Sequence, residues 1–232
     1  MTLIIDSEDG ARSWIADQPV VSRETMEALD RLVAFVVDEA QHQNLVSAAT
    51  LTTMWQRHIL DSAQLLRFAD PQPGELWIDL GSGAGFPGLV IALMAPCRVM
   101  LVESRSLRIA YLERAIVHLG VEDRATIAGA ALDRVAAVEA DYISARAFAP
   151  LPRLLEGAER FSTEKTRWLL PKGRNARAEL ESVSSAWQHV FHVEQSMTDP
   201  DAAILVGTGR ATPLATPQPA RHRPARRHRS RS

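Results

Sequence analysis

Three closely spaced glycines follow a short apolar run that contains an acid. The run WIDL covers residues 77–80, Asp79 lies within it, and Gly81, Gly83 and Gly85 come next. Glycine adopts positive φ at little steric cost and lets the backbone approach a ligand closely. The helix that follows such a loop offers free N–H groups at its start. The segment therefore predicts a site for a nucleotide-like ligand at the end of a buried strand.

Two classes of ligand fit this loop. Gly83, Gly85 and Gly88 match the dinucleotide pattern GxGxxG, with Glu103 roughly 20 residues further on. Read from Asp79, the same loop resembles motif I of S-adenosylmethionine-dependent methyltransferases, where an acidic loop attracts the amino end of the ligand and repels a pyrophosphate. Glu103 can accept hydrogen bonds from both ribose hydroxyls. We favour S-adenosylmethionine as the cofactor. A dehydrogenase, or a glycine turn without a ligand, is the alternative.

The segments that must position this loop alternate between strand and helix patterns. Expected strands are Leu76–Leu80, Val99–Glu103, Ala125–Ala128, Tyr142–Ala147, Arg167–Leu170, His189–Glu194 and Ala203–Val206. Expected helices between them are Gly88–Met94, Ser106–Leu119, Leu132–Val138 and Leu151–Ala158. Residues 22–41 and Leu51–Phe68 show helical periodicity ahead of the first strand. We predict an α/β fold with a doubly wound, mostly parallel sheet and a final antiparallel hairpin.

The amino-acid composition indicates which class of protein to expect. The 232 residues are 46% hydrophobic and 23% charged, which is typical of a globular protein. No apolar run approaches the roughly 20 residues of a membrane span. The single cysteine, Cys97, can form neither an intrachain disulfide nor a zinc site alone. We therefore expect a cytoplasmic protein without membrane contact or metal, and we expect it to be a monomer.

Charge is distributed unevenly along the chain. Seven of the 26 basic residues and none of the 28 acidic residues lie from Arg210 onward, so the rest of the chain holds 19 bases against 28 acids. We divide the chain into a helical extension (1–70), a core (71–208) and a basic tail (209–232). The tail is rich in proline, alanine and arginine, which predicts disorder. It is either a solvated extension or an electrostatic arm for nucleic acid.

Six separated segments stand out along the chain: Asn44–Leu45, RHILDS at Arg57–Ser62, DLGSGAGFPG at Asp79–Gly88, VESRSLRIAYL at Val102–Leu112, ARAFAPL at Ala145–Leu151 and LPKG at Leu170–Gly173. Together they resemble the bacterial small-subunit ribosomal RNA guanine-N7 methyltransferases (RsmG, also called GidB). The resemblance covers roughly residues 22–208. RHILDS, GFPG and RAFA are not general methyltransferase motifs, so the resemblance is specific.

The resemblance implies a class I methyltransferase fold, Rossmann-like with seven strands, and an N-terminal helical extension. It implies transfer of methyl from S-adenosylmethionine to guanine N7 in the 530 loop of 16S rRNA, presented as RNA, as the 30S subunit or as an assembly intermediate. By position, Gly81 and Phe86 match cofactor contacts, Ala131 and Leu132 match the adenine site, and Arg146 matches an arginine beside the cofactor. The family often reads R-x-E after the third strand, whereas this chain has Ala130–Asp133, so backbone contacts to adenine are expected there.

The full set of expected site residues follows from these two arguments. Expected cofactor contacts are Asp79, Gly81, Gly83, Gly85, Phe86, Glu103, Ala131, Leu132 and Arg146. Expected RNA contacts are Arg146, Lys172, Arg57 and His58.

Chemistry at guanine N7 sets what the site must do. N7 carries a lone pair and no proton, so no general base is expected and the task is in-line placement. The neighbouring O6 accepts hydrogen bonds from arginine or lysine, and Arg146 and Lys172 end the fourth and fifth strands. Arg146 could instead form a salt bridge that covers the cofactor site, and Lys172 could be a solvated loop charge. His58 and Asp61 could form a structural pair that docks the N-terminal helices. A methyltransferase acting on another RNA, a protein or a small molecule, and a cofactor-binding protein without catalysis, are the alternative functions.

Overall fold

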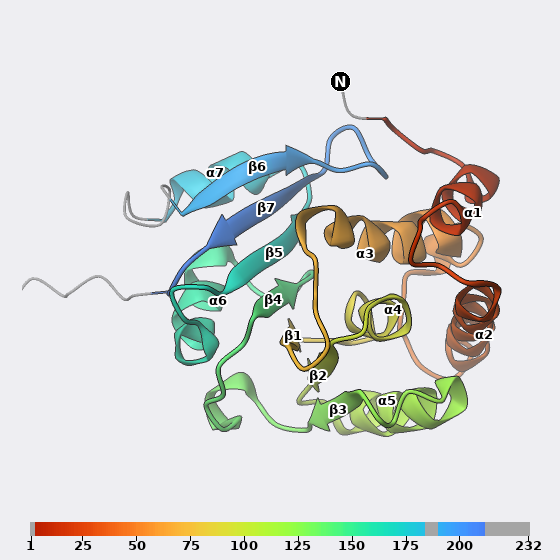
Figure 1. Ribbon diagram of the computed structural model, residues 1–232, viewed down its shortest axis with the longest axis horizontal. Coiled ribbons are helices and arrows are strands. Elements are labelled where there is room, and N and C mark those ends of the chain that lie inside the picture. The colour runs from red at the N-terminus through yellow and green to blue at the C-terminus, as the bar shows by residue number, and fades with distance from the viewer. Residues whose placement is uncertain (1–2, 184–189, 212–232) are drawn as a thin grey trace, which may run out of the picture.

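The computed structural model describes residues 3–183 and 190–211, and a seven-stranded sheet runs through them (Figure 1). The strands are β1 (Leu76–Leu80), β2 (Arg98–Val102), β3 (Ala125–Ala128), β4 (Tyr142–Ala145), β5 (Arg167–Lys172), β6 (Phe191–Gln195) and β7 (Ala203–Thr208). Their order is β3-β2-β1-β4-β5-β7-β6. Only the pairs that involve β7 are antiparallel. The prediction of a mostly parallel sheet ending in an antiparallel hairpin is confirmed.

Helices cover both faces of the central strands, so β1 is buried along its whole length. Trp77 points into the core on one face, where α4 (Gly88–Met94) and α5 (Ser106–Leu119) pack. Ile78 points into the core on the other face, beneath α6 (Leu151–Ala158). A short helix, α7 (Ala176–Glu181), packs near β6 and β7 (Figure 1). Alternation of side chains along each strand therefore divides the core into two layers.

The N-terminal extension lies on the α4–α5 side of the sheet (Figure 1). It contains α1 (Glu8–Ala16) and α2 (Arg23–Glu39), and α2 packs against α4 and α5. The hydroxyl of Ser7 accepts a hydrogen bond from the Gly10 N–H and so caps α1. The sequence pattern predicted α2, whereas α1 and α7 were missed.

The expected helix over Leu51–Phe68 is present but unevenly wound. A 3₁₀ turn, η1 (Ala48–Thr50), precedes it. The stretch itself comprises the π-helical segment η2 (Trp55–Leu60), one α turn, α3 (Asp61–Ala63), and a 3₁₀ segment, η3 (Gln64–Phe68). Short π-helical segments occur frequently at functional sites, because the wider turn changes which groups the backbone presents.

The predicted helix over Leu132–Val138 is wrong. Only the 3₁₀ turn η4 (Leu132–Arg134) forms there. Arg160, in the 3₁₀ turn η5 (Glu159–Phe161), supplies the reason. Its guanidinium donates hydrogen bonds to the backbone carbonyls of Leu132, Asp133 and Val135. A distant side chain therefore takes the acceptors that a continuing helix would use.

The turn between β6 and β7 contacts the N-terminal extension. The Ile5 N–H donates to the Met197 carbonyl at 2.8 Å. The Met197 N–H donates to the side-chain oxygen of Gln64 at 2.8 Å, and the Thr198 hydroxyl donates to Asp61 Oδ1 at 3.0 Å. Segments from the two ends of the described chain are thus joined by hydrogen bonds.

Two expectations fall partly outside the described residues. Of the expected strand His189–Glu194, the structure shows residues 191–195, and His189 lies outside. Of the expected tail, only residues 209–211 are described, and the buried Ala211 donates its N–H to Ser162 Oγ at 2.8 Å. None of the described helices is both long and apolar enough to cross a membrane.

Candidate functional site: two adjoining cavities at the carboxyl edge of the sheet

The glycine loop after β1 requires glycine because of its backbone conformation and because neighbouring side chains leave no room for a Cβ atom. Gly81, Gly83 and Gly85 have φ values of 69°, 57° and 88°. The N–H groups of Gly81 and Ser82 donate to the Val102 carbonyl at 2.9 and 3.0 Å, which fastens the loop to the end of β2. A Cβ atom on Gly81 would lie 2.3 Å from the ring of Phe148. The loop can therefore hold this shape only with glycine at these points.

Asp79 stabilises the loop from behind and lies outside the cavity. Its side chain is fully buried. Oδ1 accepts a hydrogen bond from Ser144 Oγ at 2.8 Å, and Oδ2 accepts one from the Gly88 N–H, the first residue of α4, at 3.2 Å. Burial raises the pKa of this carboxyl to about 6. Asp79 therefore holds the loop in place from behind, and its expected contact with the cofactor stays a prediction.

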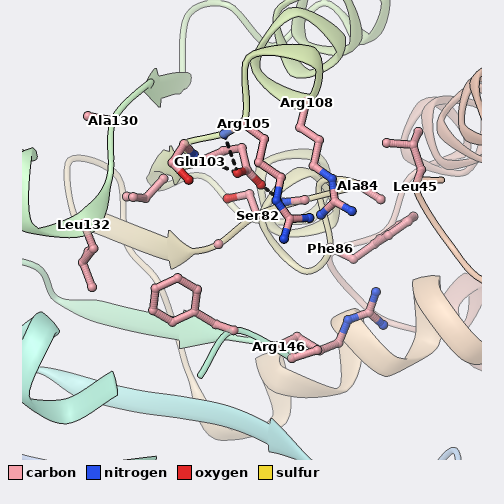
Figure 2. Close-up of a pocket in the computed structure, with 16 residues that line it drawn as sticks. Leu45, Ser82, Ala84, Phe86, Glu103, Arg105, Arg108, Ala130, Leu132 and Arg146 are labelled. Carbon is pink, nitrogen blue, oxygen red and sulfur yellow. Dashed lines mark hydrogen bonds between the residues drawn. The ribbon is translucent and has the colours of Figure 1, made fainter. Parts of the chain in front are cut away.

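A first cavity of about 440 Å³ opens above the glycine loop (Figure 2). Parts of five segments surround it. Its walls come from Leu45 of the extension, the glycine loop, residues 102–105 and Arg108 at and after the end of β2, Ala130 and Leu132 after β3, and residues 146–148 after β4. Among the nine expected cofactor contacts, Gly81, Gly83, Phe86, Glu103, Leu132 and Arg146 line this cavity, whereas Asp79, Gly85 and Ala131 do not.

Glu103 is held in a fixed orientation at the wall of the first cavity. The residue is buried. Oε2 accepts a hydrogen bond from the Gly83 N–H at 3.1 Å, and Oε1 accepts from the N–H groups of Ser104 and Arg105 at 2.7 and 2.9 Å. Because a carboxylate offers about four lone-pair sites, further donors can still bind there. Glu103 therefore provides a preorganised acceptor for hydroxyl groups.

Arg146, directly after β4, is bound by the extension. Nη1 donates to Asp61 Oδ2 and to the Arg57 carbonyl, each at 3.2 Å, and Nη2 donates to His58 Nδ1 at 3.0 Å. The guanidinium also lies 5.4 Å from the centre of the Phe86 ring. These contacts use three of the five N–H donors of the guanidinium and leave two for a ligand. We call Arg146, His58 and Asp61 the arginine clamp.

His58 is neutral in the arginine clamp. Burial, together with the positive charges of Arg146 and Arg57, lowers the pKa of His58 to about 3. Because Nδ1 accepts from Arg146, Nε2 carries the ring proton and donates it to Thr50 Oγ1 at 2.9 Å. The imidazole also stacks on Phe86 at 5.0 Å between ring centres. His58 and Asp61 therefore dock the extension through Arg146 rather than by pairing with each other.

A second cavity, of about 820 Å³, adjoins the first. It lies between the π-helical segment η2, the end of β5 and the turn after β6. The two cavities share only Arg146, Ala147 and Phe148 among the residues described around them. Ala147 has a φ of 52°, which is uncommon for a residue with a Cβ atom. One short segment after β4 thus forms the boundary between the cavities.

The other expected RNA contacts line the second cavity. Lys172 Nζ pairs with Glu179 at 2.8 Å and donates to the Ala149 carbonyl at 3.4 Å. Arg57 pairs with Asp199 at 3.5 Å. Arg146 and Asp61 form a third ion pair, so three ion pairs line this cavity.

Sequence reasoning missed several residues at the first cavity. Leu45, Arg105 and Arg108 lie on its walls (Figure 2). Phe148 lies on them as well. Phe148 could have been found as the aromatic residue two positions after Arg146. Arg105 and Arg108 lie within Val102–Leu112, a segment that the sequence analysis used only for the family resemblance. In residues 3–183 and 190–211, no cluster of three or more histidine, cysteine or acidic side chains could hold a metal.

The chain matches the family model described as GidB, rRNA small subunit methyltransferase G, over residues 25–203. Proteins named ribosomal RNA small subunit methyltransferase G are similar to it over most of its length. The one from Rhizorhabdus wittichii is 52% identical over 87% of this chain and 93% of its own length. The one from Erythrobacter litoralis is 51% identical over 90% and 99%, respectively.

Solved structures show a similar fold at low sequence identity. A ribosomal protein L11 methylase from Lactobacillus delbrueckii subsp. bulgaricus aligns with a TM-score of 0.54 and 14% identity, covering 65% of this chain and 77% of that one. A variant of MtNAS crystallised with S-adenosylmethionine aligns with a TM-score of 0.53 and 18% identity, covering 88% and 84%. At such identities the likeness concerns the fold, which is that of class I methyltransferases.

Proposed function

Because this chain belongs to the rRNA small subunit methyltransferase G family, we propose that it transfers a methyl group from S-adenosylmethionine to N7 of a guanine in the 530 loop of 16S rRNA. The first cavity holds the methyl donor and the second holds the target guanine. The enzyme works as a monomer in the cytoplasm. Its extension (1–70), core (71–208) and basic tail (209–232) form the functional divisions of the chain.

The observation that carries this proposal is the boundary shared by the two cavities. Arg146, Ala147 and Phe148 stand after β4, beside the glycine loop. In doubly wound sheets, ligands bind at the carboxyl ends of the strands where the strand order reverses, which here is between β1 and β4. A donor and an acceptor placed on either side of one short segment can be brought into line for transfer.

The first cavity fits the methyl donor in size and chemistry. About 440 Å³ lies within the usual range for small-molecule sites. Glu103 suits the ribose hydroxyls, and Ala130 and Leu132 offer an apolar wall for adenine. When bound, S-adenosylmethionine supplies a methyl group that its sulfonium makes electrophilic.

The second cavity suits an acceptor that needs no general base. His58 is neutral, and its ring proton is donated to Thr50. Asp61 is bound by Arg146 and Thr198. Guanine N7 has no proton to lose, so these engaged groups are compatible with the reaction. The two free donors of Arg146 can read guanine O6, and Lys172 and Arg57 can contact O6 or a phosphate.

The test is methylation of defined RNA substrates. Purified enzyme is incubated with labelled S-adenosylmethionine and either naked 16S rRNA or 30S subunits from cells that lack this activity, and the product is mapped by mass spectrometry. We expect one N7-methylguanine in the 530 loop. The Arg146→Ala variant serves as the inactive control. Methylation at another atom or in another RNA, or none on either substrate, would contradict the assignment.

A further inference from the structure

Arg108 brings a guanidinium to the junction of the first cavity, the glycine loop and the extension. It belongs to α5, and its Nη2 donates to the Asn44 carbonyl at 3.2 Å. A Cβ atom on Gly83 would lie only 2.9 Å from its Nη1, so the guanidinium packs directly on the glycine loop. Figure 2 shows the side chain pointing from α5 toward Ala84 and Leu45. One side chain thus bridges the core and the extension at the cavity wall.

The charge of this guanidinium is not balanced by the protein. Of the cations on the wall, Arg146 pairs with Asp61. No carboxylate in the described part of the chain pairs with Arg108. Glu103, the only acid on this wall, directs both oxygens to backbone N–H groups. A half-buried cation without a partner favours an anionic group of a ligand.

The cavity wall also sets which end of the ligand lies beside Arg108. Ala130 and Leu132 form the apolar end, and Glu103 lies between them and the arginines (Figure 2). Arg108 stands at the opposite end, with Leu45. A nucleoside with its base at Leu132 and its ribose at Glu103 therefore directs its remaining substituent toward Arg108. In S-adenosylmethionine this substituent ends in an amino acid, whose carboxylate is the only anion of the ligand.

We propose that Arg108 binds the carboxylate of S-adenosylmethionine and, through Asn44, holds the extension against the occupied cavity. This rests on the proposed placement of the methyl donor in the first cavity. Four of the five donors of Arg108 remain free after the bond to Asn44, which is enough for a two-pronged carboxylate contact. Arg105, a second cation on this wall, is the rival for this role, but it is exposed, whereas Arg108 is half-buried and packs on the glycine loop.

The experiment compares two ligands that differ only in the carboxylate. Calorimetry measures the dissociation constants of S-adenosylmethionine and decarboxylated S-adenosylmethionine for the full chain and for Arg108→Ala, Arg108→Lys and Arg105→Ala. Both ligands retain the sulfonium, the ammonium, the ribose and the adenine. The ratio of their dissociation constants therefore reports the contact with the carboxylate alone.

We expect the unchanged protein to prefer S-adenosylmethionine by about tenfold to a hundredfold, the range for a hydrogen-bonded charge pair. Arg108→Ala should lose this preference while it binds the decarboxylated ligand as before, which also shows that its cavity is intact. Arg108→Lys should keep part of the preference, because it keeps the charge without the planar fork. Arg105→Ala should keep all of it.

Three results would overturn the role of Arg108 without affecting the proposed function. The first is an equal loss of affinity for both ligands in Arg108→Ala. The second is an unchanged preference for S-adenosylmethionine in that variant. The third is a preference that disappears in Arg105→Ala instead. Failure of the unchanged protein to bind either ligand would contradict the methyl-donor site itself, and the inference would be overturned with it.

Discussion

At the scale of single residues, Arg146 connects the most parts of the site. It touches both cavities and is bound by Asp61, His58 and the Arg57 carbonyl. Its own strand places it at the boundary, while the extension orients its guanidinium. The arrangement uses the rigid, multi-donor geometry that distinguishes arginine from lysine.

We predict that Arg146→Ala lowers the rate of methyl transfer by about 10²- to 10³-fold, the usual cost of losing a positioned donor. Arg146→Lys should recover little, because one ammonium cannot replace the fork. Single-turnover assays on 30S subunits measure the rate, and thermal unfolding checks that the variant is folded. Transfer at the normal rate by a folded Arg146→Ala protein would remove Arg146 from the mechanism.

His58 makes the stability of the protein sensitive to acid. Its pKa is about 3 in the folded protein, against an ordinary value of 6.5. Between pH 6.5 and 3, the unfolded chain therefore binds a proton at His58 that the folded protein does not bind. The stabilising contribution is complete above pH 6.5 and is lost as the pH falls from 6.5 toward 3.

We predict that the free energy of unfolding falls by about 2 kcal/mol more between pH 7.5 and 5 in the unchanged protein than in His58→Gln. Glutamine lacks a titratable ring but can still accept a hydrogen bond from Arg146. Urea unfolding at the two pH values measures the difference. Parallel pH dependence in both proteins would show that His58 is not protonated on unfolding in this range.

At the scale of elements, the apolar wall of the first cavity depends on Arg160. This side chain binds three carbonyls of the segment that contains η4, and Leu132 of that segment lines the cavity. The segment has little regular structure of its own, so its position is set from outside. Exposed Arg153, on α6, provides a matched arginine away from these carbonyls.

We predict that Arg160→Ala raises the dissociation constant of S-adenosylmethionine about tenfold, because the loss of charged hydrogen bonds releases the wall at Leu132. Arg153→Ala should leave the constant unchanged. Calorimetry measures both. If the two variants bind equally well, η4 is held by its packing alone and Arg160 is dispensable for the cavity.

The elements also show what sequence reasoning can reach. Strands were predictable where a run of buried residues lies between turn residues, as in β1, β4, β5 and β7. The glycine loop was predictable because positive φ restricts the residue type. The helix predicted at Leu132–Val138 failed, since its periodicity could not reveal that Arg160 takes the carbonyls. The position of Asp79 behind the loop was not predictable from the sequence, because it depends on hydrogen bonds with Ser144 and Gly88. Leu45 was missed because only the packing of the extension brings it to the cavity, and Arg108 was missed because only the packing of α5 on the glycine loop reveals its position.

At the scale of the whole molecule, a test of the basic tail must remove its arginines without disturbing the packed residues that precede them. Residues 209–211 belong to the packed structure: Gly209 accepts a hydrogen bond from Trp168 Nε1 at 2.8 Å, and Ala211 is buried. A deletion that begins at Arg210 would therefore damage the core. Deletion of residues 212–232 removes six arginines and leaves these contacts in place.

We predict that deletion of residues 212–232 weakens binding to 16S rRNA and reduces the slope of log affinity against log salt concentration, because fewer counterions are released. Replacing the same six arginines by glutamine in the full chain should have the same effect. Fluorescence anisotropy at several salt concentrations measures the slope. A slope that is the same with and without the tail would mean that these arginines do not contact RNA.

The hydrogen bonds between the turn after β6 and the extension have a consequence for how the enzyme is made. Asp61, which orients Arg146, is itself bound by Thr198. Asp61, Arg146 and Thr198 therefore leave the ribosome one after another, although they meet in one hydrogen-bonded group. Domains tend to fold as their sequence emerges, yet this site cannot be completed until the hairpin of β6 and β7 has been synthesised. Nascent chains cut short before Thr198 would carry the glycine loop but not a finished active site, so activity is acquired late in synthesis.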